Sequence, residues 1–246
     1  MKKNKHTLFL IPWHIGNSYD ITLSAVRCMR RLRCFLVEDP KLSRRQFAPF
    51  LGAALAGKEF LLIPEEPDAE FLRTVLDLLK KEDVGLASSG GVPCFIDPGA
   101  WIVKAVRERG VLVTALAGAS CLSTMLSLSG IKWHSDSTCI FSFVFFLEGA
   151  PADPKYVRFL KAAAREDEAL VVLLSSKSFK TCLDILAPVV GERSISVFFD
   201  LTKGPSPKYP YADQVRTMSC AAWRREAGLI RWPEVGDVSM IIHPKT

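Results

Sequence analysis

The chain has 246 residues, which is enough to bury one large hydrophobic core or two smaller ones without disulfides or metals. Apolar residues make up 49% of it and charged residues 24%, a globular composition that excludes a coiled coil, a collagen-like chain and a disordered tail. The formal net charge of +6 permits a polyanionic partner without requiring one.

Strand-like and helix-like segments alternate along the sequence, which predicts an α/β fold with mainly parallel strand pairing. In the first half we expect strands at Leu8–Pro12, Arg33–Glu38, Phe60–Ile63, Val84–Ala87 and Val111–Leu116, and helices at Ile21–Arg31, Leu42–Ala56, Pro67–Lys81 and Ala100–Arg109. In the second half we expect helices at Ser120–Ser129, Pro154–Arg165 and Phe179–Val189, and strands at Cys139–Leu147, Leu170–Leu174, Ser194–Asp200 and Val238–Ile242. A boundary after Ala117 gives two α/β domains, 1–117 and 118–246.

Prolines and glycines mark the irregular parts of this pattern. Pro49 is expected to bend the second helix, and three prolines between Lys203 and Trp232 predict a hairpin or a mobile loop there. The uncharged stretch Val111–Ile131 is interrupted by glycines and many hydroxyl residues, so we expect no segment to cross a membrane.

The seven cysteines are odd in number and scattered, and they never form a C-x-x-C pair; the four histidines are equally dispersed. The pattern therefore indicates neither a disulfide framework nor a metal site. Most of the cysteines lie in apolar runs, which suits a reducing compartment, and we expect a cytoplasmic protein.

The positive charge is concentrated at one end of the chain. Residues 1–46 carry ten Lys or Arg against three Asp or Glu, a net charge of +7, whereas the remaining 200 residues carry 22 basic and 23 acidic groups. A polyanion such as RNA could dock on the basic end. The alternative is a solvated helix face beside a frayed lysine tail.

Three polar, glycine-bearing loops follow predicted strands, at residues 12–17, 88–99 and 116–120. The carboxyl ends of parallel strands share one edge of the sheet, where small molecules bind, so these loops predict a ligand site. Within the longest loop, Asp97 is expected to cap the helix that begins at Ala100. The chain has neither G-x-x-x-x-G-K-[ST] nor a strand followed by G-x-G-x-x-G, which argues against an ATPase or an ordinary dinucleotide-binding protein.

The order of these motifs resembles the tetrapyrrole methylase superfamily, and most closely its branch of small-subunit ribosomal RNA cytidine 2′-O-methyltransferases. The family patterns P-T-P-I-G-N, E-D-T-R-x-S, S-D-A-G-T-P-x-I-S-D-P-G, P-G-P-S and E-L-T-K are matched or echoed, in that order, by the segments 12–17, 38–43, 88–99, 117–120 and 200–203. The resemblance implies two α/β domains, usually in a homodimer, with S-adenosylmethionine bound in a cleft between them.

Site residues are carried over position by position from this resemblance. The cofactor is expected to meet Pro12, Gly16, Ser89, Gly90, Val92, Pro93 and Ser120. The acceptor, ribosomal RNA or the small ribosomal subunit, is expected to meet Lys41, Arg44 and Arg45, and the candidate catalytic residues are Glu38, Asp39 and Lys203.

The sequence also departs from the family patterns. Ser89 replaces the acidic residue of S-D-A-G, which removes a strong hydrogen-bond acceptor and leaves a hydroxyl capable of a weaker bond. Pro40 and Lys41 replace the threonine and arginine of E-D-T-R, and Trp13-His14 replaces T-P. Trp13 or His14 is expected either to stack on a base or to lie buried in the fold.

Methylation of a ribose hydroxyl requires alignment of three atoms and removal of one proton, without a metal. A carboxylate of Glu38 or Asp39, or a Lys203 amine with a lowered pKa, could accept that proton. Alternatively, the two carboxylates pair with nearby arginines and Lys203 caps a strand end. Two other functions stay open: methylation of a tetrapyrrole or another small molecule, and RNA binding by a degenerate, non-catalytic member.

Overall fold

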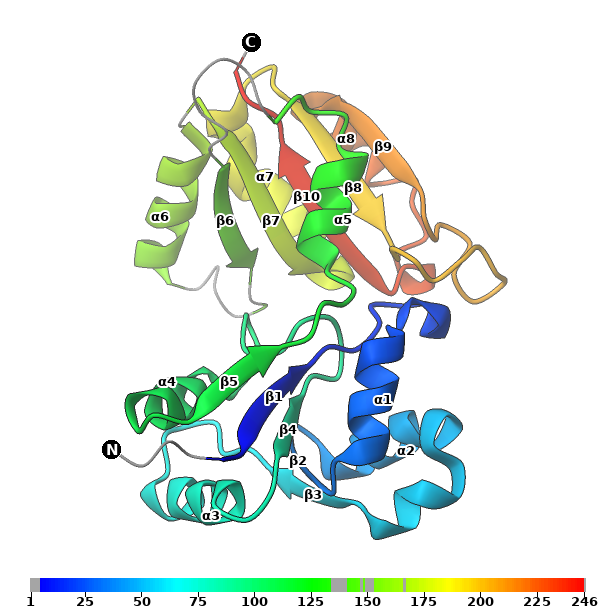
Figure 1. The fold of residues 1–246 in the computed structure, drawn as a ribbon. Helices are drawn as coiled ribbons and strands as arrows, with labels where there is room; N and C mark the ends of the chain where they lie inside the picture. The colour runs from blue at the N-terminus through cyan, green and yellow to red at the C-terminus, as the bar shows by residue number, and fades with distance from the viewer. Residues whose placement is uncertain (1–4, 134–140, 147, 149–152, 166, 246) are drawn as a thin grey trace. The chain divides into compact units, whose positions relative to one another are not determined.

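The structure is a computed structural model that describes residues 5–133, 141–146, 148, 153–165 and 167–245. The chain divides into two compact units, residues 1–120 and 121–246 (Figure 1). Each unit is a β-sheet covered by helices, which confirms the predicted α/β class.

The N-terminal unit is built on a fully parallel five-stranded sheet in the order β3-β2-β4-β1-β5. All five predicted strands are present, with bounds within one residue of the prediction. They are β1 (Thr7–Ile11), β2 (Cys34–Val37), β3 (Glu59–Leu62), β4 (Val84–Ala87) and β5 (Leu112–Ala115).

Helices cover both faces of this sheet, because side chains alternate between the two faces along each strand. In β2, Phe35 and Val37 pack in one apolar cluster with residues of α1 (Leu23–Arg31) and α2 (Pro40–Leu51). Leu36, between them, packs in another with residues of α3 (Ala69–Leu79) and α4 (Ala100–Glu108). The continuous apolar run of β2 is thus buried on both sides, as in doubly wound α/β folds.

Helix α2 begins and ends earlier than predicted. Asp39 is its N-cap and Pro40 its first residue. Proline is favourable there because an N–H at the first helical position would have no partner within the helix. Gly52, at a φ of 52°, ends the helix, and a 3-10 helix at Gly52–Gly57 takes up the rest of the predicted span. Pro49 therefore lies near the end of a short helix instead of bending a long one.

The C-terminal unit contains a mixed sheet in the order β6-β7-β10-β8-β9. Its strands are β6 (Phe141–Phe146), β7 (Ala169–Ser175), β8 (Ser194–Phe199), β9 (Val215–Ser219) and β10 (Asp237–Ile242). Among these described strands, β6 and β7 pair in parallel, whereas β10 runs antiparallel to β7 and β8, and β9 runs antiparallel to β8. Among the described strand pairs of the whole chain five are parallel and three antiparallel, so the prediction of mainly parallel pairing is confirmed for the chain although it does not hold within this unit.

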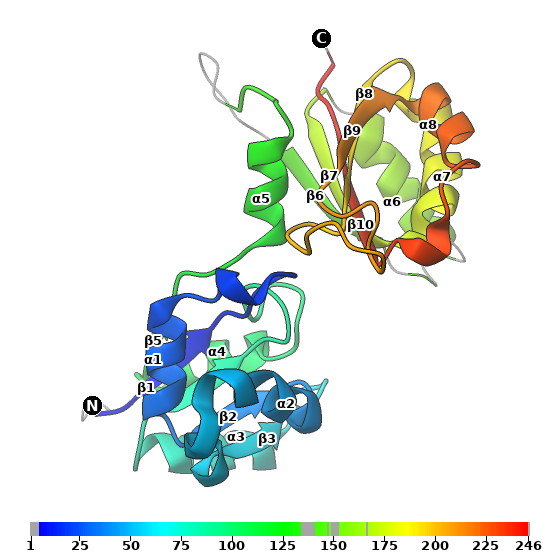
Figure 2. The same ribbon diagram turned by 90° about the vertical axis from the view of Figure 1, so that its right-hand side faces the viewer.

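For the proline-rich region from Lys203 to Trp232, the structure confirms the hairpin rather than the mobile loop. The region closes the antiparallel β8–β9 pair, as a hairpin does, and then forms α8 (Cys220–Glu226). Together with α6 (Pro154–Arg165) and α7 (Phe179–Val190), α8 covers one face of the sheet, while α5 (Cys121–Leu128) covers the other (Figure 2). The predicted strand Cys139–Leu147 is described only at residues 141–146.

Two further expectations concern thiols and membranes. Every cysteine that the structure describes is a free thiol, and Cys139 lies outside the described residues. None of the helices in the described ranges combines the length and the apolar character that a membrane crossing needs.

Candidate functional site

The carboxyl edge of the N-terminal sheet brings three loops side by side. Ala87, the last residue of β4, is in register with Ile11 at the end of β1 and with Val37 at the end of β2. Because these strands are parallel, the next residues along the chain, including Glu38 and Ser88, begin loops at neighbouring positions. This is the edge at which α/β sheets bind ligands.

The loop after β4 is held by hydrogen bonds of Ser88. Its Oγ lies 2.7 Å from Asp97 Oδ2 and accepts a hydrogen bond from the Gly90 N–H at 3.0 Å. Asp97 is thus engaged within the loop and does not cap α4, whose N-cap is Gly99 at a φ of 115°. The predicted capping role of Asp97 is wrong; its carboxylate closes the loop instead.

Glu38 binds the same loop from the end of β2. The Ser89 N–H donates to Glu38 Oε1 at 3.1 Å, and the Ser89 hydroxyl lies 3.3 Å from both carboxylate oxygens. On the other side, Gln46 Nε2 of α2 donates to the Ser89 carbonyl at 3.0 Å. Ser89 is therefore used to join the loop to Glu38 and α2, and the carboxylate at this edge comes from residue 38.

The carboxyl groups of this edge are electrostatically coupled. Burial raises the pKa of Glu38, the hydrogen bond from the Ser89 N–H opposes that rise, and nearby Asp97 adds to it. Burial likewise raises the pKa of Asp97, against the hydrogen bond from Ser88. The Cys94 thiol beside them has a pKa of about 12, raised first by burial and then by Asp97 and Glu38, so it stays protonated at neutral pH.

Glycines at this edge have two effects. Gly91 and Gly118 allow the loops to approach closely, whereas Gly90 borders open space. The Trp13 N–H donates to the Gly91 carbonyl at 2.8 Å, and a Cβ at Gly118 would lie only 2.3 Å from the Pro12 ring. A Cβ at Gly90, by contrast, would meet no atom within 4 Å. Val92, Phe95 and Ile96, further along the same loop, are exposed apolar side chains.

Several buried polar atoms near this edge have no hydrogen-bond partner among the described residues. They are Trp13 Nε1, His14 Nδ1 and Gln46 Oε1. The Trp13 ring is 2% exposed and stacks on Phe47 at 5.3 Å, so it is part of the fold rather than a platform for a base. Burial lowers the pKa of His14, and Asp20 partly opposes that shift.

A family model described as Tetrapyrrole (Corrin/Porphyrin) Methylases matches residues 7–204, which span both units. The chain belongs to the tetrapyrrole methylase family. Its similarity to curated relatives confirms the resemblance drawn from the motifs. "Ribosomal RNA small subunit methyltransferase I" of Leptospira biflexa is 27% identical over 213 residues, or 86% of this chain and 84% of the relative. The Xylella fastidiosa protein of the same name is 31% identical over 199 residues, or 80% and 69%.

Solved structures of the family show the same fold. The uroporphyrin-III-C-methyltransferase of Thermus thermophilus is 17% identical, with a TM-score of 0.59 over 97% of this chain and 94% of that chain. A second structure described as the native form of uroporphyrin III C-methyl transferase from the same organism gives a TM-score of 0.56 at 20% identity.

The carboxyl edge fits the S-adenosylmethionine that this methylase family implies. It combines open space at Gly90, exposed apolar side chains later in the same loop and the carboxylate of Glu38. Among the predicted cofactor residues, Pro12 and Pro93 are buried, while Gly16 and Ser120 lie in the loops after β1 and β5. Gln46 was missed by the sequence analysis, since only its place in the second turn of α2 brings it to Ser89.

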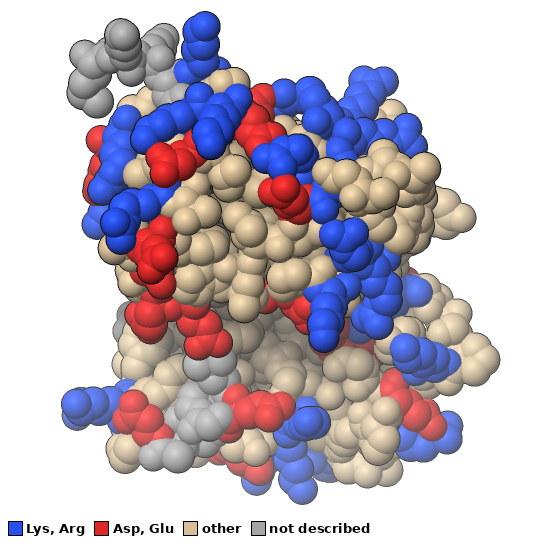
Figure 3. All heavy atoms as spheres, turned by 90° about the horizontal axis from the view of Figure 1, so that it is seen from below, with Lys and Arg blue, Asp and Glu red and all other residues tan. Residues whose placement is uncertain are grey.

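The cationic residues of the first 46 positions do not share one surface. Arg31 pairs with Asp83, and Arg33 pairs with Glu59 and Glu82, all at the amino edge of the sheet, opposite the methylase motifs. Figure 3 shows this mixture of basic and acidic groups over one face of the molecule. Acidic groups of other segments thus pair with Arg31 and Arg33, two of the ten cations counted in residues 1–46.

The three predicted RNA-contacting cations lie on α2 but differ in their surroundings. Lys41, in the first turn, and Arg45 are exposed and have no ion pair among the described residues. Arg44 donates to the Lys58 carbonyl at 3.0 Å and lies 5.0 Å from the centre of the Phe60 ring, so it ties α2 to β3.

The other two predicted catalytic residues are engaged in the fold. The Asp39 carboxylate caps α2, accepting from the N–H groups of Lys41 at 2.8 Å and Leu42 at 3.0 Å. Lys203 lies in the C-terminal unit, where its Nζ is 2.6 Å from both Asp200 Oδ1 and Asp237 Oδ2. Burial lowers the pKa of Lys203, but the hydrogen bonds to the two aspartates outweigh it and the pKa is raised. The expected lowered pKa is therefore wrong.

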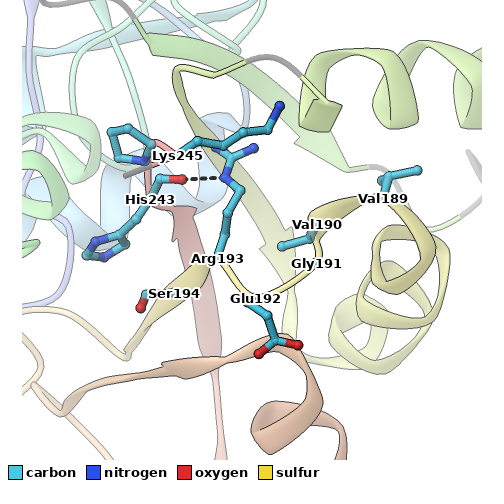
Figure 4. A pocket seen from close by; sticks show the side chains of 9 residues that line it. Val189, Val190, Gly191, Glu192, Arg193, Ser194, His243 and Lys245 are labelled. Atoms are coloured by element: carbon cyan, nitrogen blue, oxygen red, sulfur yellow. Dashed lines mark hydrogen bonds between the residues drawn. The ribbon is translucent and has the colours of Figure 1, made fainter.

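A hollow of about 490 Å³ in the C-terminal unit is lined by Val189–Ser194 and His243–Lys245 (Figure 4). Arg193, buried beside it, donates to the carbonyls of His243 at 2.6 Å and Ala164 at 2.8 Å, and Lys245 pairs with Asp167 at 2.7 Å. Arg193 and Lys245 therefore hold residues 243–245 against the rest of the unit, and we do not assign a ligand site to them. Within the described ranges no cluster of His, Cys, Asp and Glu could hold a metal ion.

Proposed function

We propose that this chain uses S-adenosylmethionine to methylate the 2′-oxygen of a ribose in small-subunit ribosomal RNA. The names of its curated relatives support a ribosomal RNA acceptor. The observation that carries the proposal is the Glu38–Ser89 contact, which sets a carboxylate beside open space at a ligand-binding sheet edge. We also propose that the protein works in the cytoplasm as a homodimer.

S-adenosylmethionine, when bound, supplies an electrophilic methyl group. The cofactor would be held by Pro12, Gly16, Ser89, Gly90, Val92, Pro93 and Ser120. Because displacement at a methyl group is in line, the main task of the protein is to hold the acceptor oxygen in position and to exclude competing water.

We assign removal of the hydroxyl proton to Glu38. A carboxylate with a raised pKa is a better general base than an ordinary one, and burial raises the pKa of Glu38. Asp39 is occupied as a helix cap, and Lys203 is held protonated between two aspartates. Lys41 and Arg45 would hold phosphates of the acceptor, and Arg44 would support them through α2.

Two measurements test this proposal. The first is calorimetric titration with S-adenosylmethionine and S-adenosylhomocysteine, beside Gly90→Leu, which fills the open space, and Gly57→Leu, which fills equally open space on the 3-10 helix after α2. We expect micromolar binding that only Gly90→Leu abolishes. The second is transfer of labelled methyl groups to unmodified small subunits, with the product mapped as a 2′-O-methyl nucleotide. Cofactor binding without transfer to RNA would overturn the assigned acceptor.

A further inference from the structure

A groove of about 480 Å³ runs between two helices of the C-terminal unit. Helices α7 and α8 lie side by side there (Figure 2). The lining residues are Lys180, Leu183 and Asp184 of α7, and Ala221, Arg224, Arg225 and Ala227 of α8 and the residue after it. Nothing in the methylase motifs involves these positions.

The groove carries a surplus of positive charge. Arg224 Nε donates to Asp184 Oδ1 at 3.3 Å, which accounts for the single acidic group of the lining. Lys180 and Arg225 are exposed and form no ion pair within the part of the chain that the structure describes. Two uncompensated cations, on different helices, therefore face one hollow.

Two neighbouring basic residues, by contrast, have acidic partners. Arg216 pairs with Glu226 at 2.9 Å, and Arg231 pairs with Glu234 at 3.0 Å. Their charges are matched where they stand, whereas the charges of Lys180 and Arg225 are not. Two cations with no acidic partner among the described residues are therefore available to an anion in this groove.

The form of the groove favours a chain of phosphates over a single small anion. A tightly held ion needs buried donors aimed at one point, but these cations are exposed and sit on long, flexible side chains. Exposed lysines and arginines suit the phosphate backbone of a nucleic acid, where contacts position the strand and release its counterions. Small side chains at Ala221 and Ala227 leave room for a backbone to approach.

We propose that the α7–α8 groove binds the phosphate backbone of the RNA substrate, as a second contact surface separate from the carboxyl edge of the N-terminal sheet. The inference rests on the proposed function for the identity of the RNA. The two phosphate-binding side chains are Lys180 and Arg225, and Arg224 becomes a third contact when phosphate competes with Asp184.

The test compares Lys180→Gln/Arg225→Gln with Arg158→Gln/Lys161→Gln, which removes the same charge from α6 in the same unit. Binding of each variant to an unmodified small-subunit ribosomal RNA transcript is measured without cofactor, from about 0.05 to 0.2 M salt. We expect the groove variant to bind at least about tenfold more weakly, and its log–log salt slope to fall by about two relative to wild type. S-adenosylmethionine titration serves as the control for folding.

The outcomes separate this inference from the proposed function. If the groove variant matches the α6 variant in affinity and salt slope, the groove does not bind RNA, whatever the methyl-transfer assay gives. If wild-type protein binds the transcript but transfers no methyl group to small subunits, the proposed function fails and the salt slope still decides the role of the groove.

Discussion

Gly118 lies directly against the pyrrolidine ring of Pro12. A Cβ at position 118 would be 2.3 Å from both Cβ and Cγ of that ring, far inside van der Waals contact. Pro12 follows β1 and Gly118 follows β5, so this approach joins two loops of the candidate cofactor site. Pro12 is buried, so its ring could move only by displacing closely packed neighbours, which costs free energy.

Replacing Gly118 with alanine should therefore force the two loops apart. We expect Gly118→Ala to lower the free energy of unfolding by about 1–3 kcal/mol, the usual cost of overpacking, and to weaken S-adenosylmethionine binding. Urea unfolding and calorimetry measure the two effects. Gly57→Ala is the control, because a Cβ there meets nothing within 4 Å. Equal losses at the two positions would show that the contact with Pro12 is not responsible.

Glu38→Gln tests the general base while keeping the shape of the side chain. The amide oxygen can still accept from the Ser89 N–H, so the loop after β4 should stay in place. We expect S-adenosylmethionine affinity within about threefold of wild type and methyl transfer reduced by about a hundredfold or more, a typical contribution of a positioned base. Single-turnover methyl transfer gives the rate. An unchanged methyl-transfer rate in this variant would show that Glu38 is not the general base.

The pH dependence of stability offers an independent check on Glu38. Its pKa is raised in the folded protein, so the folded state holds the proton more tightly than the unfolded chain. The stabilisation from protonated Glu38 is present at low pH and is lost as the pH rises through the raised pKa. We expect Glu38→Gln to gain stability relative to wild type between about pH 4 and pH 7 in urea unfolding. A constant difference across that range would contradict the raised pKa.

Much of the N-terminal unit could be predicted because its signals are local. Short apolar runs between glycine-bearing loops mark β1, β2, β4 and β5, and a strong amphipathic period marks α3. The shared edge of the loops also follows from sequence, since parallel strands place their carboxyl ends together.

The unpredicted features depend on contacts between distant residues. The direction of β10 is set by its pairing with β7 and β8, and the strand itself carries no signal for it. The Ser89–Glu38 hydrogen bond joins residues 51 positions apart. Charge counting likewise included Arg31 and Arg33 in the net charge of residues 1–46, because nothing local shows that acidic groups of other segments pair with them.

Asp39 is expected to act through the helix rather than through the chemistry. Asp39→Ala removes the cap of α2 and should lower the free energy of unfolding by about 1 kcal/mol, whereas Asp39→Asn keeps a capping oxygen and should retain both stability and methyl transfer. Urea unfolding and single-turnover rates distinguish these expectations. A stable Asp39→Asn protein with a greatly reduced rate would instead make the carboxylate catalytic.

Arg44 and Arg45 are neighbours on α2 with different expected roles. Arg44→Gln removes a hydrogen bond to the Lys58 carbonyl and the contact with the Phe60 ring, and should cost about 1 kcal/mol of stability. Arg45→Gln should leave stability within about 0.5 kcal/mol and weaken binding to small-subunit ribosomal RNA. Unfolding and RNA-binding measurements on both variants give the comparison. If Arg44→Gln weakened RNA binding without loss of stability and Arg45→Gln lost stability, Arg44 would be the RNA-binding residue and Arg45 the structural one.

Lys203 holds together a cluster around a buried carboxylate. Asp200 is 1% exposed and accepts from the N–H groups of Gly236 at 3.0 Å and Asp237 at 2.8 Å, in addition to Lys203 Nζ. Lys203→Gln leaves this buried charge without its cation, and we expect the free energy of unfolding to fall by about 2–3 kcal/mol.

A second substitution distinguishes this electrostatic loss from simple loss of packing. Asp200→Asn in the Lys203→Gln background removes the uncompensated charge and should restore part of the stability, which a double-mutant cycle by urea unfolding at pH 7 measures as a favourable coupling. Additive losses would mean that the amine and the carboxylate do not support each other. The raised pKa of Lys203 means that its amine stays protonated at neutral pH. The methyl-transfer rate should therefore show no change near pH 7 that is caused by ionisation of Lys203.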